Sequence, residues 1–493
     1  MTTAAEEGGL RYRSPGGRWV LLATVLGSGI AFLDTTVVNV ALPTIGEDLG
    51  AGIASLQWVV NAYTLTLSGF LLLGGSLGDH YGRRRIFVLG VVWFAAASAL
   101  CGLAPTDEAL IAARALQGVG GALLTPGSLA ILEASFRRED RGPAIGAWSG
   151  LGGVTAAVGP FLGGWLVQAA SWRFIFFINL PLAALVVWVS LRHVPESRDP
   201  GADGRLDWAG AALAAAGLAG IVYALTDGPA QGWTSPVILA TGLGGVAALA
   251  AFVAWERRTA APMLPLDIFA SRQFTSANLV TFVVYGALGG SLFLMPIQLQ
   301  RVLGYSPVAS GVALVPITVV MLLLSARAGR LSSRIGPRLP MTLGPLGVAA
   351  GFALFTRIGP GASYLVDILP ASIIYGLGLT LTVAPLTSTV LAAAPPQHAG
   401  IASAVNNDVA RTAGLLAVAV LPVVAGISGA GALEPDRFAA GFRTAMAMAA
   451  VLCAAGGVLS WLAIRNPEPA PAGEHHLSCP INAPAPGHER IGQ

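Results

Sequence analysis

Charged side chains are rare inside the long apolar runs of this 493-residue sequence, and those that occur there could do chemistry. Asp34 lies in "LDTTVVNVALP" (33–43), in an apolar run that begins at Trp19. A carboxylate in a bilayer costs about 3 kcal/mol on insertion scales, so it is usually functional. Burial and a neighbouring cation shift a carboxyl's proton affinity in opposite directions, so Asp34 could bind and release a proton. It could also pair with a cationic ligand, and the ligand and the proton would then compete for the same carboxylate. The alternative is a structural acid, hydrogen-bonded between helices.

A second charged group, Arg114, lies in "RALQGVGGA" (114–122), seven residues into another apolar run. Gln117 is three residues further on and shares its helix face. A guanidinium at this depth needs a carboxylate, a carbonyl or water as its acceptor. The alternative is a snorkelling arginine that only sets membrane orientation.

A third group lies in "NNDVARTAG" (406–414), where Asp408 and Arg411 are three residues apart and Asn407 is four before the arginine. Such spacing predicts either an intrahelical ion pair or a second polar lining of a cavity. Three further residues are possible lining of a cavity: Asn39, Trp58 and Tyr63. Trp58 fits an aromatic belt at the membrane surface equally well.

The amino-acid composition indicates whether these charged groups lie in a soluble protein or in a membrane protein. Hydrophobic residues make up 54% of the chain and charged residues 11%, with a mean hydropathy of +0.70, whereas soluble domains are about 25% charged. All 28 basic residues are arginine, which excludes a Walker-type phosphate loop and Schiff-base catalysis, since both need lysine. The histidines and cysteines show no metal spacing. We therefore expect a polytopic membrane protein that is not an enzyme and has no metal or cofactor.

The apolar runs divide into fourteen predicted spans, each near the length needed to cross a bilayer. The N-terminal run has no A-x-A-like cleavage site, so it is predicted to be an uncleaved first span. With both termini cytoplasmic, 21 arginines fall on the inner side and five on the outer, as the positive-inside rule requires. The predicted spans are residues 19–41, 54–77, 87–104, 107–130, 144–168, 175–192, 208–226, 234–255, 274–298, 306–326, 340–357, 366–390, 400–427 and 441–464.

An internal repeat organises these spans. "GSLGDHYGRR" (75–84) resembles "GRLSSRIGPR" (329–338), with four identities at a constant offset of 254 residues. Two six-helix halves around an inserted helix pair explain this offset, and repeats of this kind are typical of transporters. The predicted organisation is a cytoplasmic segment (1–18), an N-terminal half (19–193), an inserted pair (194–258), a C-terminal half (259–465) and a disordered cytoplasmic tail (466–493).

Together these motifs resemble the major facilitator superfamily, specifically its fourteen-helix drug:proton antiporter branch, over residues 15–465. The motifs are "GSLGDHYGRRR" after the second span, "RALQGVGGA", "GPFLGG" (159–164), "LDTTVVNVALP" and "NNDVARTAG". The resemblance implies an all-α fold of 6+2+6 helices and ties Asp34 and Arg114 to proton coupling. It also implies a cytoplasmic gating loop formed by Gly75, Asp79, Gly82, Arg83 and Arg84, and an antiporter motif formed by Gly159, Pro160, Gly163 and Gly164. Thr155 departs from this last motif, which expects glycine there.

The expected function is therefore efflux of drugs or amphipathic, cationic small molecules in exchange for protons, by alternating access in a bacterial plasma membrane. A dedicated exporter of one endogenous metabolite or antibiotic is the alternative within transport. A non-transporting receptor or scaffold is a more distant alternative, because the motif charges are all present. The expected partners are the substrate, protons and lipid, without nucleic acid, and the expected functional unit is a monomer.

Overall fold

The computed structural model describes residues 9–199, 206–259, 262–393, 399–429 and 431–466. Fourteen helices in these ranges are long and apolar enough to cross a membrane, which confirms the predicted number of spans. The β structure of the described ranges is one isolated bridge between Leu10 and Phe136. The tail predicted to be disordered lies, beyond Asn466, outside the described residues.

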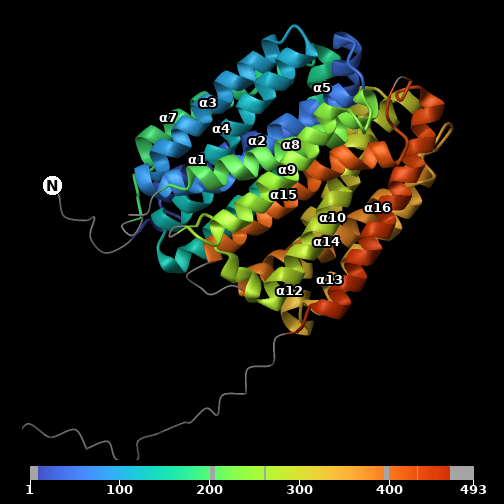
Figure 1. Cartoon of the computed structure of the whole chain (residues 1–493). Coiled ribbons are helices and arrows are strands. Elements are labelled where there is room, and N and C mark those ends of the chain that lie inside the picture. Colours follow the sequence, from blue (N-terminus) through green and yellow to red (C-terminus); the bar gives the residue numbers. More distant parts are fainter. Residues whose placement is uncertain (1–8, 200–205, 260–261, 394–398, 430, 467–493) are drawn as a thin grey trace, which may run out of the picture.

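The first six spans form one group of helices, which we call the N-terminal half; these helices run from blue to teal in Figure 1. α4 packs along both α2 and α3, while α1 contacts α5 and α7. A short helix and a longer one make up the sixth span. The bounds are α1 (Pro15–Leu49), α2 (Ile53–Tyr81), α3 (Arg83–Leu103), α4 (Asp107–Ser135), α5 (Arg138–Ala169), α6 (Phe174–Phe177) and α7 (Asn179–His193).

The last six spans form the C-terminal half, which runs from yellow-green to red in Figure 1. The ninth and twelfth spans of the chain, both in this half, include π-helical turns next to α-helices. The bounds are η1 (Leu266–Ala270), α10 (Arg272–Ile297), η2 (Gln298–Val302), α11 (Pro307–Ala313), α12 (Val315–Ile335), α13 (Arg338–Phe355), η3 (Tyr364–Ile368), α14 (Leu369–Ala392), α15 (Ala399–Val424) and α16 (Pro435–Ala463).

The predicted span 306–326 is two helices, α11 and α12, that meet at Leu314. Pro316 lacks the backbone N–H that a continuous helix would use at this point, so the helix is interrupted there. Most helices also extend beyond their predicted spans. α1 continues past Pro43 to Leu49, where Gly50 caps it, because a helix ends at its capping residue and not at the edge of the apolar run.

The inserted pair, α8 (Trp208–Gln231) and α9 (Pro236–Glu256), lies beside both halves. α8 contacts α2 of the N-terminal half and α15 of the C-terminal half. Leu218 and Val222 of α8 form a small apolar cluster with Leu415 and Ala419 of α15. The pair therefore packs against the line where the two halves meet, a position that the sequence did not predict.

Candidate functional site

Asp34 and Arg114, which the sequence indicated separately, form one ion pair between α1 and α4. Arg114 donates from Nη1 to Oδ2 of Asp34, and Gln117 donates from Nε2 to Oδ1 of the same carboxylate at 2.8 Å. The side chain of Asp34 is 0% exposed and that of Arg114 is 2% exposed. Arg114 and Gln117 share a helix face, as predicted, and both are directed at the same carboxylate.

The guanidinium of Arg114 also has acceptors outside the carboxylate. Its Nε donates to the carbonyl of Val59 on α2 at 3.1 Å, and its Nη1 donates to Oε1 of Gln117 at 2.6 Å. The ring of Tyr63 lies 4.3 Å from the guanidinium carbon, a cation–π distance. The buried hydroxyl of Tyr63 has no hydrogen-bond partner in the described part of the chain. Tyr63 therefore contributes its ring face to the network.

Two further residues of the network were missed by sequence reasoning: Ser98 of α3 and Asn179 of α7. Asn179 Nδ2 donates to Ser98 Oγ at 3.0 Å and to Oδ1 of Asp34 at 3.4 Å. Ser98 in turn donates to the carbonyl of Phe176 at 2.9 Å. Each is a polar residue in an otherwise apolar span, and both are fully buried. A polar residue within an apolar run is the sequence signal that could have marked them as candidates, although it does not indicate their partners.

The charges of Asp34 and Arg114 offset each other within this network. With Asp34 ionised, its charge offsets that of Arg114, and Gln117 and Asn179 donate to the same carboxylate. Protonation of Asp34 would leave a buried guanidinium without its counter-charge, and breaking a buried pair in this way costs several kcal/mol. A proton arriving at Asp34 would therefore favour separation of α1 from α4, or movement of Arg114 toward solvent.

The polar residues of α15 are placed differently. Asp408 and Arg411 form no ion pair with each other in the described structure. Oδ1 of Asp408 and Nε of Arg411 are buried without a hydrogen-bond partner, and Asn407 is exposed. The intrahelical pair that the spacing allowed is therefore absent. Asn406, which the sequence did not single out, donates to Asn278 and Thr281 of α10 at 3.0 and 2.8 Å.

Two other predicted lining residues have separate surroundings. Trp58 donates from Nε1 to Asp227 on α8 at 2.8 Å, and its ring lies 6.1 Å from that of Tyr223. It therefore contacts the inserted pair. Asn39 is half-buried on α1.

The predicted gating loop lies between α2 and α3. Arg83 Nε donates to Oδ1 of Asp79 at 2.8 Å, so this charge pair lies within the N-terminal half. Gly82 has a φ of +113°, which favours glycine, and a Cβ there would lie 2.7 Å from Oε1 of Glu196. Gly75 packs against Pro126 of α4.

Glu196, which follows α7, holds this loop and was missed by sequence reasoning. Its Oε1 accepts from the backbone N–H of Arg84 at 3.0 Å, and its Oε2 lies 3.6 Å from Arg84 Nε and 3.7 Å from Arg85 Nε. Arg84 Nη1 also donates to the carbonyl of Val194 at 3.0 Å. The loop is therefore tied to the end of α7.

The glycines of "GPFLGG" bring α5 close to two other helices. Gly159 and Gly163 face α1, and a Cβ at Gly163 would lie 2.8 Å from Cγ1 of Val37. Gly164 faces the carbonyl of Pro307 on α11, and Gly311 of α11 faces the carbonyl of Pro160. α5 and α11 thus approach backbone to backbone across the boundary between the two halves.

Ser68 of α2 and Asp408 of α15 lie beside each other within the bundle, and the other polar contacts between the two halves are found, within the described residues, at one end of the bundle. Gln300 donates to the carbonyl of Val40 at 2.8 Å, and Arg301 Nη1 lies 3.2 Å from Glu47 Oε1. Gln57 donates to the carbonyl of Val418 at 2.6 Å. The gating loop lies at the opposite end of α2 from Gln57, where no such cross-half contact occurs within the described ranges.

The whole sequence was also compared with known protein families and proteins. A family model described as "Major Facilitator Superfamily" matches residues 24–419. A puromycin resistance protein of Streptomyces alboniger is 38% identical over 459 residues, covering 90% of this chain and 91% of that protein. A methylenomycin A resistance protein of Streptomyces coelicolor is 33% identical over 469 residues, covering 95% and 96%. Multidrug resistance protein Stp of Mycobacterium tuberculosis is 35% identical over 416 residues, covering 84% and 77%.

The solved structures that resemble this chain share its fold at low sequence identity. A bacterial homologue of the human lysosomal transporter Spinster, inward-facing and unoccupied, matches with a TM-score of 0.66 and 18% identity, covering 91% of this chain and 97% of that one. A peptide transporter POT in complex with sulfate matches with a TM-score of 0.65 and 17% identity, covering 92% and 96%.

Proposed function

The chain belongs to the Major Facilitator Superfamily, and from this membership we propose that it is a secondary active exporter of amphipathic small molecules. It lies in a bacterial plasma membrane with both termini cytoplasmic, acts as a monomer and exchanges its substrate for protons. The direction of transport is supported by the three relatives named above, whose names are those of resistance proteins and which match most of this chain.

The observation that carries the mechanism is the buried Asp34–Arg114 pair. Its carboxylate is closed to solvent in this conformation, so proton exchange requires a conformation in which α1 and α4 are arranged differently. A proton that enters from outside binds Asp34 and releases Arg114, and its loss to the cytoplasm restores the pair. Each proton crossing about 100 mV releases about 2.3 kcal/mol from the potential alone, which supports export against a gradient.

Alternating access then follows from the position of the contacts between the halves. The bodies that move are the N-terminal and C-terminal halves (19–193 and 259–465), with α8 and α9 of the inserted pair (194–258) beside their boundary. The cross-half contacts at Gln57, Gln300 and Arg301 close the outer end, and they must open when the inner end closes. The Asp79–Arg83 pair lies at the inner end and takes new partners across the boundary in that second state.

The test is dye uptake into inverted membrane vesicles with an imposed proton gradient, using ethidium as the probe. We expect Asp34→Asn to lower gradient-driven uptake at least about tenfold, because the variant cannot exchange a proton at this position. Asp48→Asn is the matched control. It makes the same chemical change on the same helix, but Asp48 is 48% exposed and pairs with Arg173. Uptake that persists in the Asp34 variant, or after an uncoupler collapses the gradient, would overturn the mechanism.

A second candidate is a dedicated exporter of one compound, and the names of two relatives favour it. The proteins of Streptomyces alboniger and Streptomyces coelicolor are each named for resistance to a single antibiotic. A susceptibility panel in a host lacking its own efflux pumps separates the candidates. Resistance to one compound supports the dedicated exporter, and resistance to several unrelated compounds supports the broad one.

A further inference from the structure

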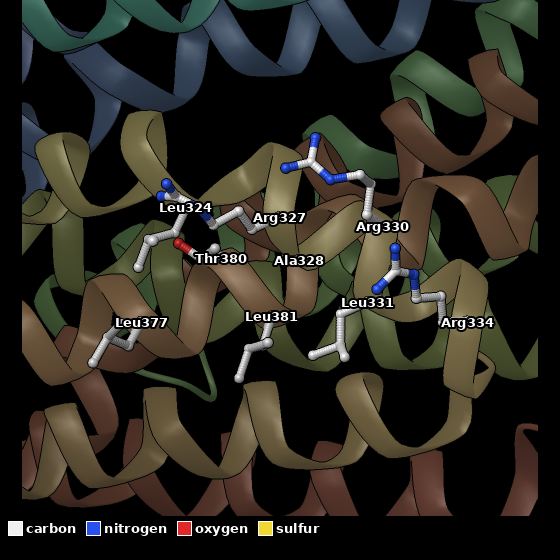
Figure 2. Close-up of a pocket in the computed structure, with 9 residues that line it drawn as sticks. All are labelled: Leu324, Arg327, Ala328, Arg330, Leu331, Arg334, Leu377, Thr380 and Leu381. Atoms are coloured by element: carbon white, nitrogen blue, oxygen red, sulfur yellow. The ribbon is translucent and has the colours of Figure 1, made fainter.

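A pocket of about 500 Å³ lies between α12 and α14, outside the Asp34 network. Figure 2 shows the guanidinium groups of Arg327 and Arg330 on one side of this pocket and the side chains of Leu377 and Leu381 on the other, with Leu324 beside Arg327 and Leu331 beside Arg334. The pocket is thus lined by both basic and apolar side chains. Its lining residues are Arg327, Arg330, Arg334, Leu324, Leu331, Leu377 and Leu381, with Ala328 and Thr380.

The three arginines have no acidic partner within the described part of the chain. Arg327 donates to the carbonyl of Leu323 at 3.2 Å, which is one turn back on its own helix. Arg330 and Arg334 are exposed and form no ion pair there. Like charges one turn apart on a helix repel each other, so these residues lower helix stability unless an anion offsets them.

The three arginines lie on the inner side in the predicted orientation and contribute to the positive-inside bias, but the internal repeat does not require them there. In the N-terminal half, the positions 254 residues earlier are Leu73, Ser76 and His80, so the repeat carries no arginine there. Arg327 also lies nine residues before Gly336, or about 13 Å along the helix at 1.5 Å per residue. Its side chain therefore starts from within α12, more than two turns before the loop.

We propose that this pocket binds the anionic group of an amphipathic substrate, such as a carboxylate, sulfonate or phosphate joined to an apolar body. Guanidinium groups form paired hydrogen bonds with such oxyanions, and the leucines cover the apolar body. The volume lies in the range of small-molecule sites. This inference rests on the proposed export function and specifies its substrate class as organic anions, in addition to the cationic compounds that the sequence predicted.

The experiment uses the whole protein in phosphatidylcholine nanodiscs, with the fluorescent sulfonate 1-anilinonaphthalene-8-sulfonate as the anionic probe and ethidium as the cationic one. We expect the triple variant R327Q/R330Q/R334Q to weaken sulfonate binding about tenfold and to leave ethidium binding unchanged. The triple lysine variant should retain most of the affinity. The control R257Q/R258Q removes two exposed charges at the end of α9, outside the pocket. Unchanged sulfonate affinity in the glutamine variant would overturn the proposal.

Two further measurements distinguish a failure of the anion-site proposal from a failure of the proposed export function. Proton-driven uptake of the sulfonate into inverted vesicles should fall in the glutamine variant, while ethidium uptake stays. If phosphatidylglycerol displaces the sulfonate and uptake is the same in variant and wild type, the pocket holds a lipid headgroup and the substrate assignment is wrong. If the wild type takes up neither probe but the variant loses sulfonate binding, the export function fails and the anion site stands.

Discussion

The two copies of the repeated loop, residues 75–84 and 329–338, share a backbone geometry but carry different charges. Gly82 and Gly336 both have positive φ, at +113° and +83°. In one copy the N–H of Arg84 donates to Glu196; in the other the N–H of Arg338 donates to Asn466, in each case at 3.0 Å. These acceptors each follow their helix, α7 or α16, by three residues.

The charges do not repeat with the backbone. Asp79 and Arg83 form an ion pair in the first copy, whereas Ser333 and Pro337 occupy the same positions in the second. The shared part anchors each loop to the last helix of its half. The unshared part is what a gate could use, because a charge pair can exchange partners while a capped turn cannot. We therefore propose that the first copy gates transport and that both copies anchor their loops.

The largest effect on stability should come from the two glycines that give both loops the same backbone geometry. Gly82→Ala and Gly336→Ala should each lower the free energy of unfolding by about 1–3 kcal/mol, because both require a conformation that is almost restricted to glycine. Thermal unfolding in detergent measures this, with Gly52→Ala as the control. Gly52 has a φ of −78° and open space around its Cα. A neutral result at Gly336 would show that the second loop is not an equivalent anchor.

The next effect should separate the two copies in transport. We expect Asp79→Asn to lower ethidium uptake about tenfold with little change in stability, since this partly exposed pair between residues four apart contributes about 1 kcal/mol at most. Ser333→Ala should leave uptake unchanged, because its hydroxyl donates only to the carbonyl of Arg330 on its own helix. Equal losses from both substitutions would remove the distinction between gate and anchor.

The smallest effect should come from the acceptors. Glu196→Gln keeps an acceptor for the N–H of Arg84 but loses the charge that lies 3.6–3.7 Å from Arg84 and Arg85. We expect a loss of at most about 1 kcal/mol that becomes smaller at high salt without vanishing, because Glu196 is partly buried and such pairs are screened less than exposed ones. Asn466→Asp should show the opposite sign, since it places a carboxylate beside the N–H of Arg338. Salt-independent changes would mean that packing, and not charge, is responsible.

Much of the fold could be predicted from the sequence, because hydropathy and arginine placement report on the bilayer directly. The fourteen spans and the family were confirmed, and Arg114 was correctly placed on one face with Gln117. The helix ends were wrong by several residues, because caps such as Ser14 and Gly50 decide them.

Partners on other helices could not be predicted in the same way. Asn179 reaches Asp34 from α7, while Ser98 on α3 accepts from Gln117 and Asn179. No spacing along the chain links these residues. Glu196 reaches its loop from beyond α7 for the same reason. In α15, spacing allowed a pair between Asp408 and Arg411, but a spacing of three residues permits a contact without requiring it.

The glycine contacts between α5 and α11 have a mechanical consequence. Gly164 and Gly311 each face a carbonyl of the opposite helix, so neither helix presents a side chain at these points. The backbones of α5 and α11 can therefore rotate against each other without interlocking side chains at these points. A methyl group added at either glycine would clash with the opposite carbonyl and hinder this rotation.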